Sequence, residues 1–343
     1  MKVYMPGRIV DGHVGGNTVY SRHIRDGLLA QGHQVESIKP ASRPQLTMVK
    51  ETLFGLKKPA SSQELIHYVA DTGPLLKPRY PSVVTVHGVA SRWIDVARSK
   101  SADWVWRTRV QKAIDLTDRV ITVSHSSADD VAEVFGIDQK SITVIPHGID
   151  ADFFATPTQI SPENQAKITG PYVLYLGNIE PRKNLVPLLK AFQTPEVQAL
   201  GLQLVIAGKP AWDFAETMAE LERTPNTVHL GFVSDDDRRA LMQAAELFVF
   251  PSLYEGFGFP VLEALAAGTV VLASRRGSLA EVAGPAIALE DLSVEGIAAG
   301  LVEAASSQQL RQTCLEQGRQ WASAFSWEAS VQAHLDVYKE VLR

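Results

Sequence analysis

Short apolar, often β-branched runs alternate with helix-like patterns along the whole chain, and six candidate strands fall in each half. In the first half they are residues 3–5, 34–38, 65–70, 83–87, 120–124 and 142–146, and in the second half residues 172–176, 203–207, 228–230, 247–251, 270–273 and 286–289. Strands that alternate with helices are typical of parallel sheets covered by crossover helices. The pattern predicts an α/β protein built from two doubly wound, Rossmann-like domains.

The domain boundary is predicted from length and local composition. A chain of 343 residues exceeds the size of a single hydrophobic core, and the stretch after Pro146 is rich in Pro, Gly, Ser, Thr and Gln without periodic apolar spacing. We predict domains at 1–150 and 171–327, a linker at 151–170, and a final helix at 328–343 that packs back on the first domain. Because open parallel sheets bind ligands beyond the carboxyl ends of their strands, we expect a substrate cleft between the domains.

Composition excludes several protein classes. With 45% hydrophobic and 21% charged residues, the chain is typical of a globular protein. No apolar stretch reaches the roughly 18 to 20 residues that a membrane span needs, and the first residues do not resemble a secretion signal. We therefore expect a cytoplasmic protein. The single cysteine, Cys314, is expected to be an inert thiol.

Charge is divided unevenly along the chain. Residues 1–150 hold 19 Lys and Arg against 15 Asp and Glu, and the remainder holds 14 against 23. The first half could face an anionic lipid surface or a phosphorylated substrate, or the difference could reflect nothing specific. Within it, residues 91–112 combine Trp93, Trp104 and Trp106 with six Lys and Arg. Such a helix suits peripheral docking on an anionic membrane, although ordinary packing explains it equally well.

Two segments carry residue types suited to phosphate. The first strand leads to adjacent glycines, Gly15 and Gly16, at a helix start, where backbone amides can approach a phosphate or can simply form a tight turn. The strand at 172–176 is followed by Arg182 and Lys183 before the next helix. Two cations at the carboxyl end of a parallel strand are well placed to neutralise a diphosphate.

A third segment places two carboxylates around a glycine-rich turn. After the strand at 247–251 the chain continues Glu255-Gly-Phe-Gly-Phe-Pro-Val-Leu-Glu263, and we predict that Glu255 lies in the loop and Glu263 in the first turn of a helix. Carboxylates of this kind can accept hydrogen bonds from sugar or ribose hydroxyls, while the amides between them meet phosphate or sugar oxygens. Alone, Glu263 could instead be a helix-dipole partner, and Phe257 and Phe259 simple core residues.

One acidic run could be mistaken for a metal site. Asp235, Asp236 and Asp237 follow Ser234 after a strand, as in the aspartate sites of metal-dependent transferases. Because a helix starts there, capping and dipole pairing explain the run better, and we predict no metal site and no cofactor.

Taken in order, these motifs resemble the GT-B fold retaining glycosyltransferases of family 4, the group 1 transferases. Glu255 and Glu263 enclose seven residues, as in the E-x7-E motif of that family. The Gly15-Gly16 loop, Val83-Val-Thr-Val-His87, Val120-Ile-Thr-Val-Ser124, Pro146-His-Gly-Ile-Asp150 and the run from Gly177 to Asn184 match the family in the same order. The resemblance covers essentially the whole chain.

The resemblance implies a donor site for a nucleoside diphosphate sugar. Arg182 and Lys183 would bind the diphosphate, Glu263 the ribose, and His87 the sugar from the first domain. Glu255 would bind the transferred sugar, and Gly15 and Gly16 would approach the diphosphate or the acceptor. Phe232 would border the base, and the remaining donor contacts would be Gly256, Phe257, Gly258, Phe259, Val261 and Leu262.

The implied reaction is transfer of a hexose with retention to a glycan or lipid-linked acceptor, without a metal, in polysaccharide or lipopolysaccharide assembly. The motifs are mannosyltransferase-like, which favours GDP-mannose as donor. No nucleic-acid partner is expected, and the oligomeric state stays open. The alternatives are a sugar-nucleotide epimerase or hydrolase of the same fold, and an inactive binding protein; a glycosidase would not explain the phosphate-binding features.

Overall fold

The computed structural model describes residues 1–12, 15–92 and 100–343. The chain forms two compact units, one made of Met1–Gly148 with Phe325–Arg343 and the other of Ile149–Ala324. Among the described residues, none of the helices combines the length and the apolar character that crossing a membrane requires.

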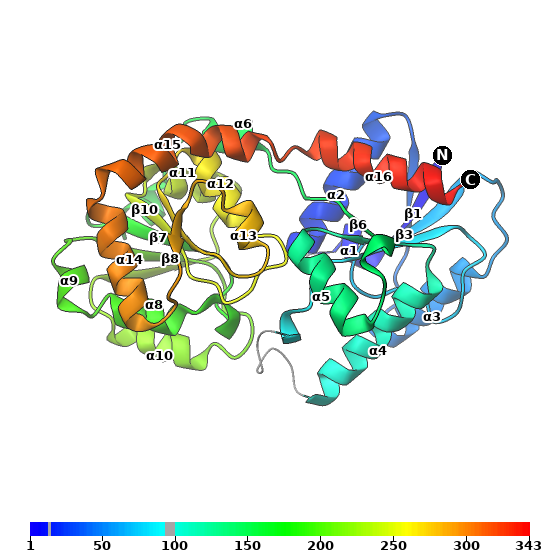
Figure 1. The fold of residues 1–343 in the computed structure, drawn as a ribbon, viewed down its shortest axis with the longest axis horizontal. Coiled ribbons are helices and arrows are strands. Elements are labelled where there is room, and N and C mark those ends of the chain that lie inside the picture. Colours follow the sequence, from blue (N-terminus) through cyan, green and yellow to red (C-terminus); the bar gives the residue numbers. More distant parts are fainter. Residues whose placement is uncertain (13–14, 93–99) are drawn as a thin grey trace. The chain divides into compact units, whose positions relative to one another are not determined.

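The first unit is built on a six-stranded parallel sheet (Figure 1). Its strand order is β2-β1-β3-β4-β5-β6, so the winding reverses between β1 and β3. The strands are β1 (Lys2–Pro6), β2 (Gln34–Ile38), β3 (Glu64–Tyr68), β4 (Ser82–Val86), β5 (Arg119–Thr122) and β6 (Ile142–Val144). The helices of this unit are α1 (Gly7–Val10), α2 (Gly15–Ala30), α3 (Pro44–Gly55), η1 (Ala90–Arg92), α4 (Lys100–Leu116), α5 (His125–Phe135), η2 (Gln139–Ser141) and α16 (Trp327–Val341).

The final helix of the chain, α16, packs against α2 of the first unit (Figure 1). A buried polar network joins them to the sheet: the Tyr20 hydroxyl lies 2.7 Å from His334 Nε2 and 2.9 Å from Thr85 Oγ1, and the Tyr338 hydroxyl lies 2.7 Å from His67 Nδ1. His67 Nε2 closes the network 2.8 Å from Thr85 Oγ1. Since buried polar groups are costly unless paired, this network fixes how α16 sits on the sheet.

The second unit has its own six-stranded parallel sheet, in the order β12-β11-β10-β7-β8-β9. The winding reverses between β7 and β10. The strands are β7 (Tyr172–Leu176), β8 (Gln203–Ala207), β9 (Thr227–Gly231), β10 (Leu247–Phe250), β11 (Val271–Ser274) and β12 (Ile287–Leu289). Helical segments of this unit are α6 (Ala151–Ala155), α7 (Pro162–Gln165), η3 (Pro181–Lys183), α8 (Leu185–Ala191), α9 (Pro195–Gln198), α10 (Ala215–Arg223), α11 (Asp235–Ala244), α12 (Phe259–Ala267), α13 (Leu279–Val282), α14 (Val294–Ser306) and α15 (Gln308–Ser323).

Each predicted strand range overlaps a strand of the structure, and the predicted doubly wound α/β class is confirmed. The predicted linker, 151–170, belongs to the second unit and contains α6 and α7. Asp237 holds α7 in this segment, because its carboxylate accepts hydrogen bonds from the Ser161 amide at 2.7 Å and from Asn164 Nδ2 at 2.9 Å. Helices of four and five residues are too short to form without such tertiary contacts.

Candidate functional site

Arg182 and Lys183 lie at the point where the second sheet reverses its winding. They follow the buried strand β7 on η3, a single 3₁₀ turn that begins at Pro181. Asn184 ends that turn with φ of 58°, a left-handed conformation that asparagine tolerates better than most residues, and α8 starts directly afterwards. The reversal of the chain at Asn184 keeps both cations at the carboxyl edge of the sheet.

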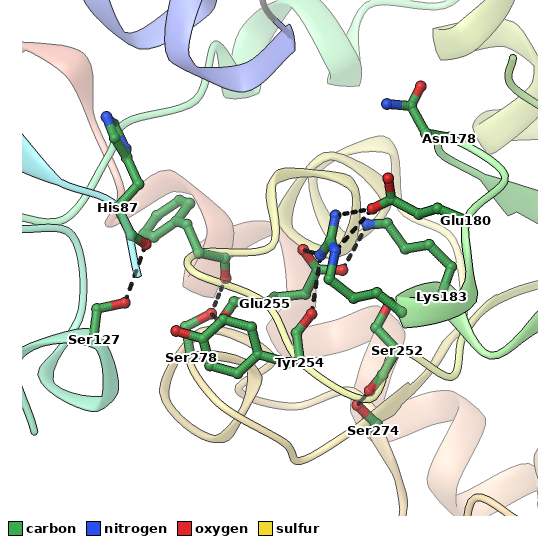
Figure 2. A network of polar contacts seen from close by, with 12 residues as sticks. His87, Ser127, Asn178, Glu180, Lys183, Ser252, Tyr254, Glu255, Ser274 and Ser278 are labelled. Atoms are coloured by element: carbon green, nitrogen blue, oxygen red, sulfur yellow. Dashed lines mark hydrogen bonds and ion pairs between the residues drawn. The ribbon is translucent and has the colours of Figure 1, made fainter. Parts of the chain in front are cut away.

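Glu255 comes from the loop after β10, the strand next to β7, and pairs with both cations (Figure 2). Its carboxylate lies 2.6 Å from Lys183 Nζ and 2.6 Å from Arg182 Nη1. Arg182 also donates from Nε to Glu180 Oε1 at 2.8 Å and from Nη1 to the Tyr254 carbonyl at 2.9 Å. Two carboxylates and two cations therefore form one ion-pair cluster, which we call the β7–β10 cluster: Glu180, Arg182, Lys183 and Glu255.

Three members of the β7–β10 cluster, Glu180, Lys183 and Glu255, are buried, and the charges of the cluster shift one another's pKa values. Lys183 is 5% exposed, and its Nζ also lies 4.7 Å from the centroid of the Phe250 ring. Burial opposes ionisation of Glu255, but the charges of Arg182 and Lys183 outweigh it and lower the pKa of Glu255 to about 2. Burial and the neighbouring guanidinium lower the pKa of Lys183, and Glu255 offsets them only in part. The pKa of Arg182 is raised, since its two carboxylates outweigh burial.

The loop that carries Glu255 is fixed by hydrogen bonds to its backbone (Figure 2). Ser278 donates from Oγ to the carbonyls of Glu255 at 3.0 Å and Phe257 at 2.7 Å, and Ser274 donates to the carbonyl of Ser252 at 2.6 Å. Gly258 precedes α12 with φ of 105°, where an L side chain would be strained and would also meet Leu279. The sugar-binding candidate is thus held on a defined backbone.

Glu263 lies at the fifth position of α12, after the first turn in which we predicted it, so the reading as a partner of the helix dipole is not supported. The side chain is 6% exposed. Oε1 accepts from Arg238 Nη1 at 3.1 Å, whereas Oε2 has no hydrogen-bond partner among the described residues. Burial raises the pKa of Glu263 and Arg238 lowers it less. A buried carboxylate oxygen without a partner is costly unless a ligand donates to it.

The other predicted donor residues differ in their exposure to solvent. Val261 and Leu262 are fully buried, and the Val261 amide already donates to the Gly258 carbonyl at 3.1 Å, so their side chains belong to the core. Phe257 is buried too and packs edge-on against Phe259, with 5.2 Å between the two ring centroids. Phe232 follows β9 and is 72% exposed, with Lys209 Nζ 4.4 Å from its ring centroid.

His87 and the glycine pair belong to the first unit. His87 follows β4, and its Nε2 lies 3.0 Å from the carbonyl oxygen of Val69 while its amide donates to Asp71 at 2.9 Å. A carbonyl only accepts, so Nε2 carries the proton and Nδ1 of the neutral ring is an acceptor. The His87 carbonyl accepts from Ser127 at 3.3 Å (Figure 2). Gly15 begins α2 with φ of 55° and has open space around its Cα, and Gly16 is exposed beside it.

Three contributors were missed from the sequence: Glu180, Ser278 and Arg238. Glu180 lies two residues before Arg182, and only the turn at Pro181 brings the two side chains together. Ser278 and Arg238 come from other loops and helices, so no spacing motif links them to Glu255 or Glu263. The one sequence signal available was the position of Glu180, a carboxylate two residues before Arg182.

The acidic run is a helix start. Ser234 Oγ accepts from the Asp237 amide at 3.1 Å and caps α11, with Asp235, Asp236 and Asp237 in its first turn. The helix begins at Asp235, the first aspartate of the run. No group of His, Cys, Asp or Glu suited to a metal ion occurs among the described residues.

Comparisons with known proteins identify two matching family models. A family model described as glycosyl transferases group 1 matches residues 158–321, and one described as glycosyltransferase family 4 matches residues 64–153. O-antigen chain mannosyltransferase B of Escherichia coli is 31% identical over 239 residues, which cover 67% of this chain and 62% of that protein. MMP alpha-(1->4)-mannosyltransferase of Mycolicibacterium hassiacum is 28% identical over 285 residues, covering 78% and 67% respectively.

The match to the Escherichia coli protein thus spans less than two thirds of its length. Among solved structures, Anabaena Alr3699/HepE in complex with UDP and glucose superposes with a TM-score of 0.74 at 19% identity, covering 99% of this chain and 100% of that one. This likeness concerns the fold, and it confirms the predicted two-domain GT-B class.

Proposed function

Because the chain belongs to the group 1 glycosyl transferases of family 4, we propose that it moves a hexose from a nucleoside diphosphate sugar to a glycan or lipid-linked acceptor, with retention at the anomeric carbon. One observation carries the proposal: Arg182, Lys183 and Glu255 meet at the carboxyl ends of β7 and β10, where the second sheet reverses its winding. Ligands of doubly wound sheets bind at that position.

The donor's diphosphate would bind Arg182 and Lys183. Both cations are paired with carboxylates in the ligand-free cluster, so an arriving diphosphate would take the place of Glu255 as their anionic partner. Glu255 would then be released to accept hydrogen bonds from hydroxyls of the transferred sugar, with the amides of residues 256–259 beside it. The exchange leaves both cations paired with an anion before and after binding.

The nucleoside would extend toward two features of the same unit. Glu263 offers Oε2, a buried acceptor without a protein partner among the described residues, to the ribose hydroxyls. Phe232 offers an exposed ring and Lys209 a cation near the base. In the first unit, His87 Nδ1 would accept from a sugar hydroxyl, and the amides of Gly15 and Gly16 would approach the diphosphate or the acceptor.

In the proposed reaction the bond from the anomeric carbon to the diphosphate breaks, and the acceptor oxygen bonds to the same face of that carbon. The acceptor's proton passes to the leaving diphosphate. Arg182 and Lys183 would stabilise the charge that develops on that leaving group, which is the role a metal ion plays in other transferases. We therefore propose a metal-independent reaction, and activity that persists in EDTA would support it.

The donor sugar is proposed from the relatives. Both curated relatives described above are named as mannosyltransferases, and one is named for the O-antigen chain. We infer mannose from GDP-mannose as the donor and bacterial polysaccharide or lipopolysaccharide as the setting. These specifics rest on similarity, whereas the diphosphate site rests on the cluster itself.

We also propose peripheral contact with the cytoplasmic face of a membrane through residues 91–112. Of this segment, 93–99 with Trp93 lie outside the described residues. On α4, Trp104 is 69% exposed and Val105 50% exposed. The first unit also exposes Leu46, Val49 and Leu53 on α3, one helical face that carries Lys50 nearby. Exposed apolar residues among cations suit an anionic bilayer.

A thermal-shift panel of nucleoside diphosphates and their sugars tests the donor site. Stabilisation by GDP-mannose above the other nucleotide sugars is expected, since a ligand at 100 times its Kd adds about 2.7 kcal/mol. If no nucleoside diphosphate raises the melting temperature, the proposal is wrong.

Product analysis separates transfer from the alternative activities. Free sugar or an isomerised nucleotide sugar, formed without an acceptor, would identify a hydrolase or epimerase instead. Binding without turnover would identify an inactive binding protein. Anomeric proton couplings of the product measure retention directly.

A further inference from the structure

The first unit has a basic pocket between helix α4 and Thr72, and Thr72 lies near the winding reversal of the sheet. Arg8 follows β1 on α1, and Thr72 follows β3, the neighbouring strand across the reversal. Arg8 Nη2 donates to Thr72 Oγ1 at 3.0 Å. The carboxyl ends of these two strands are the position at which a doubly wound sheet binds ligands, and the predicted donor residues of the first unit do not include either side chain.

The charges at this position are not balanced. Arg8 Nε donates to Glu51 Oε1 at 3.1 Å, and Glu51, from α3, is only 2% exposed. Arg109, from α4, is the second guanidinium, and no carboxylate of the described residues lies within ion-pair distance of it. Burial and Arg8 lower the pKa of Arg109, while Glu51 raises it less. Among the described residues, Glu51 pairs with Arg8 and acts on Arg109 only at longer range, which leaves a net positive charge around the two guanidinium groups.

Arg109 faces a pocket of about 420 Å³ that opens to solvent. Its lining combines Thr72, Ser101 and Arg109 with the apolar Ala102, Val105 and Trp106. Ser101 and Ala102 belong to the first turn of the 17-residue helix α4, whose amino end favours negative charge. An anion beside an apolar group fits this lining better than a neutral sugar does.

We propose that this pocket, defined by Thr72, Ser101, Val105, Trp106 and Arg109 with Arg8 behind it, binds the phosphate ester of a phosphorylated acceptor. The guanidinium of Arg109 pairs with the phosphate, and Arg8 adds to the local positive potential. Val105 and Trp106 contact the apolar part next to the phosphate. The identification of this ligand as the acceptor rests on the proposed transferase function. The prediction that the pocket binds a phosphate ester rests on the pocket alone and does not depend on that function.

Titration with octyl phosphate tests the pocket. We expect the wild type to bind it, Arg109→Gln to bind at least tenfold more weakly, and Arg109→Lys, which keeps the charge but loses the planar guanidinium, to bind with an affinity between the two. Arg79→Gln is the matched control, because it removes an exposed cation of the same unit outside the pocket and should bind like the wild type. Octyl glucoside, with the same chain and no charge, should bind poorly. Equal binding of octyl phosphate by Arg109→Gln and wild type would overturn the proposal, as would equal binding of octyl glucoside and octyl phosphate.

Two further probes separate the sources of the phosphate. If the acceptor is lipid-linked, Arg109→Gln weakens binding to phosphatidylglycerol vesicles; if it is a soluble sugar phosphate, the variant weakens binding of glucose 6-phosphate. Either loss supports the pocket, and the absence of both contradicts it. Nucleoside diphosphates should stabilise Arg109→Gln as they do the wild type. If they stabilise neither protein while Arg109 still controls phosphate binding, the transferase function fails and the pocket stands.

Discussion

Each unit of the molecule carries a pair of cations near the winding reversal of its sheet, yet the surrounding charges differ. In the second unit, Arg182 and Lys183 are matched by two carboxylates, Glu180 and Glu255. In the first unit, Glu51 pairs with Arg8, and Arg109 has no carboxylate within ion-pair distance in the described part of the chain. A matched cluster holds its geometry without ligand and must exchange a carboxylate for an arriving anion, whereas an unmatched pair attracts an anion directly.

The buried residues that support the candidate site residues also differ between the two units. In the second unit, Lys183 lies against the Phe250 ring, which stacks on Tyr175 at 6.1 Å. In the first unit, the sheet behind His87 carries the network of Tyr20, His67, Thr85, His334 and Tyr338. An apolar support is insensitive to pH in the range where histidines titrate, and a support built on buried neutral imidazoles is sensitive. The two units should therefore respond differently to both mutation and acid.

Removal of the second cation from each site should separate their roles. Lys183→Ala is expected to lower kcat by about 10² to 10³, since one preorganised charge on a leaving group contributes about that factor. Arg109→Gln should instead raise KM for the acceptor and leave kcat unchanged. Steady-state kinetics with both substrates measures the split.

Lys190→Ala is the matched control for Lys183, because Lys190 is an exposed cation on α8 of the same unit. Its turnover should equal that of the wild type. A Lys183→Ala enzyme that keeps more than a tenth of wild-type kcat would mean that this cation does not stabilise the leaving group. The cations of the two units would then not differ in their roles as proposed.

Acid should destabilise the first unit before the second. Burial lowers the pKa of His334 to about 4 and lowers the pKa of His67 and His147 well below 6.5. Between pH 6.5 and 4 the unfolded chain takes up protons that the folded unit refuses, so stability falls as pH falls, by about 3 kcal/mol for His334. Glu255, with its pKa lowered to about 2, contributes stability that is lost only between about pH 4.5 and 2.

Hydrogen exchange read by mass spectrometry can follow the two units separately in one sample. Protection of α2 and α16 should fall from pH 6.5, and protection of η3 and β10 only below pH 4.5, once intrinsic exchange rates are corrected for pH. His334→Gln should flatten the first decline and Glu255→Gln the second. Simultaneous loss of protection in both units would contradict the division.

The strands were predictable because buried parallel strands are continuous apolar runs, and the positions of the candidate donor segments were predictable because they follow such strands directly. Tyr172–Leu176 and Gln203–Ala207 have the predicted bounds. Helices α6 and α7 were missed since residues distant in sequence hold them in place: Asp237 bonds α7, and Arg239 and Gln243 donate to carbonyls of α6. The residues of these two short helices show no helical spacing of apolar positions.

Charge balance at the two sites was not predictable. Arg8, Glu51 and Arg109 come from three helices, so no spacing in the sequence brings them together. Likewise, the sequence marked Glu255 and Lys183 as ligands of one donor but did not show that they pair with each other in its absence. Burial of Val261 and Leu262, which the resemblance placed at the donor site, follows from the packing of α12 and not from the motif.

The smallest expected effect concerns Phe232, the exposed ring that would border the base. Phe232→Ala should weaken GDP binding by about five- to tenfold, because base stacking on an aromatic ring contributes about 1 to 3 kcal/mol and an exposed ring lies at the lower end. Inorganic pyrophosphate, which lacks a base, should bind the variant and the wild type equally. The free energy of unfolding should change by less than about 0.5 kcal/mol, since the ring is 72% exposed.

Leu315→Ala, which truncates an exposed apolar side chain on α15, controls for nonspecific effects and should leave the GDP and pyrophosphate titrations unchanged. If Phe232→Ala weakens pyrophosphate as much as GDP, the ring supports the β7–β10 cluster and does not contact the base.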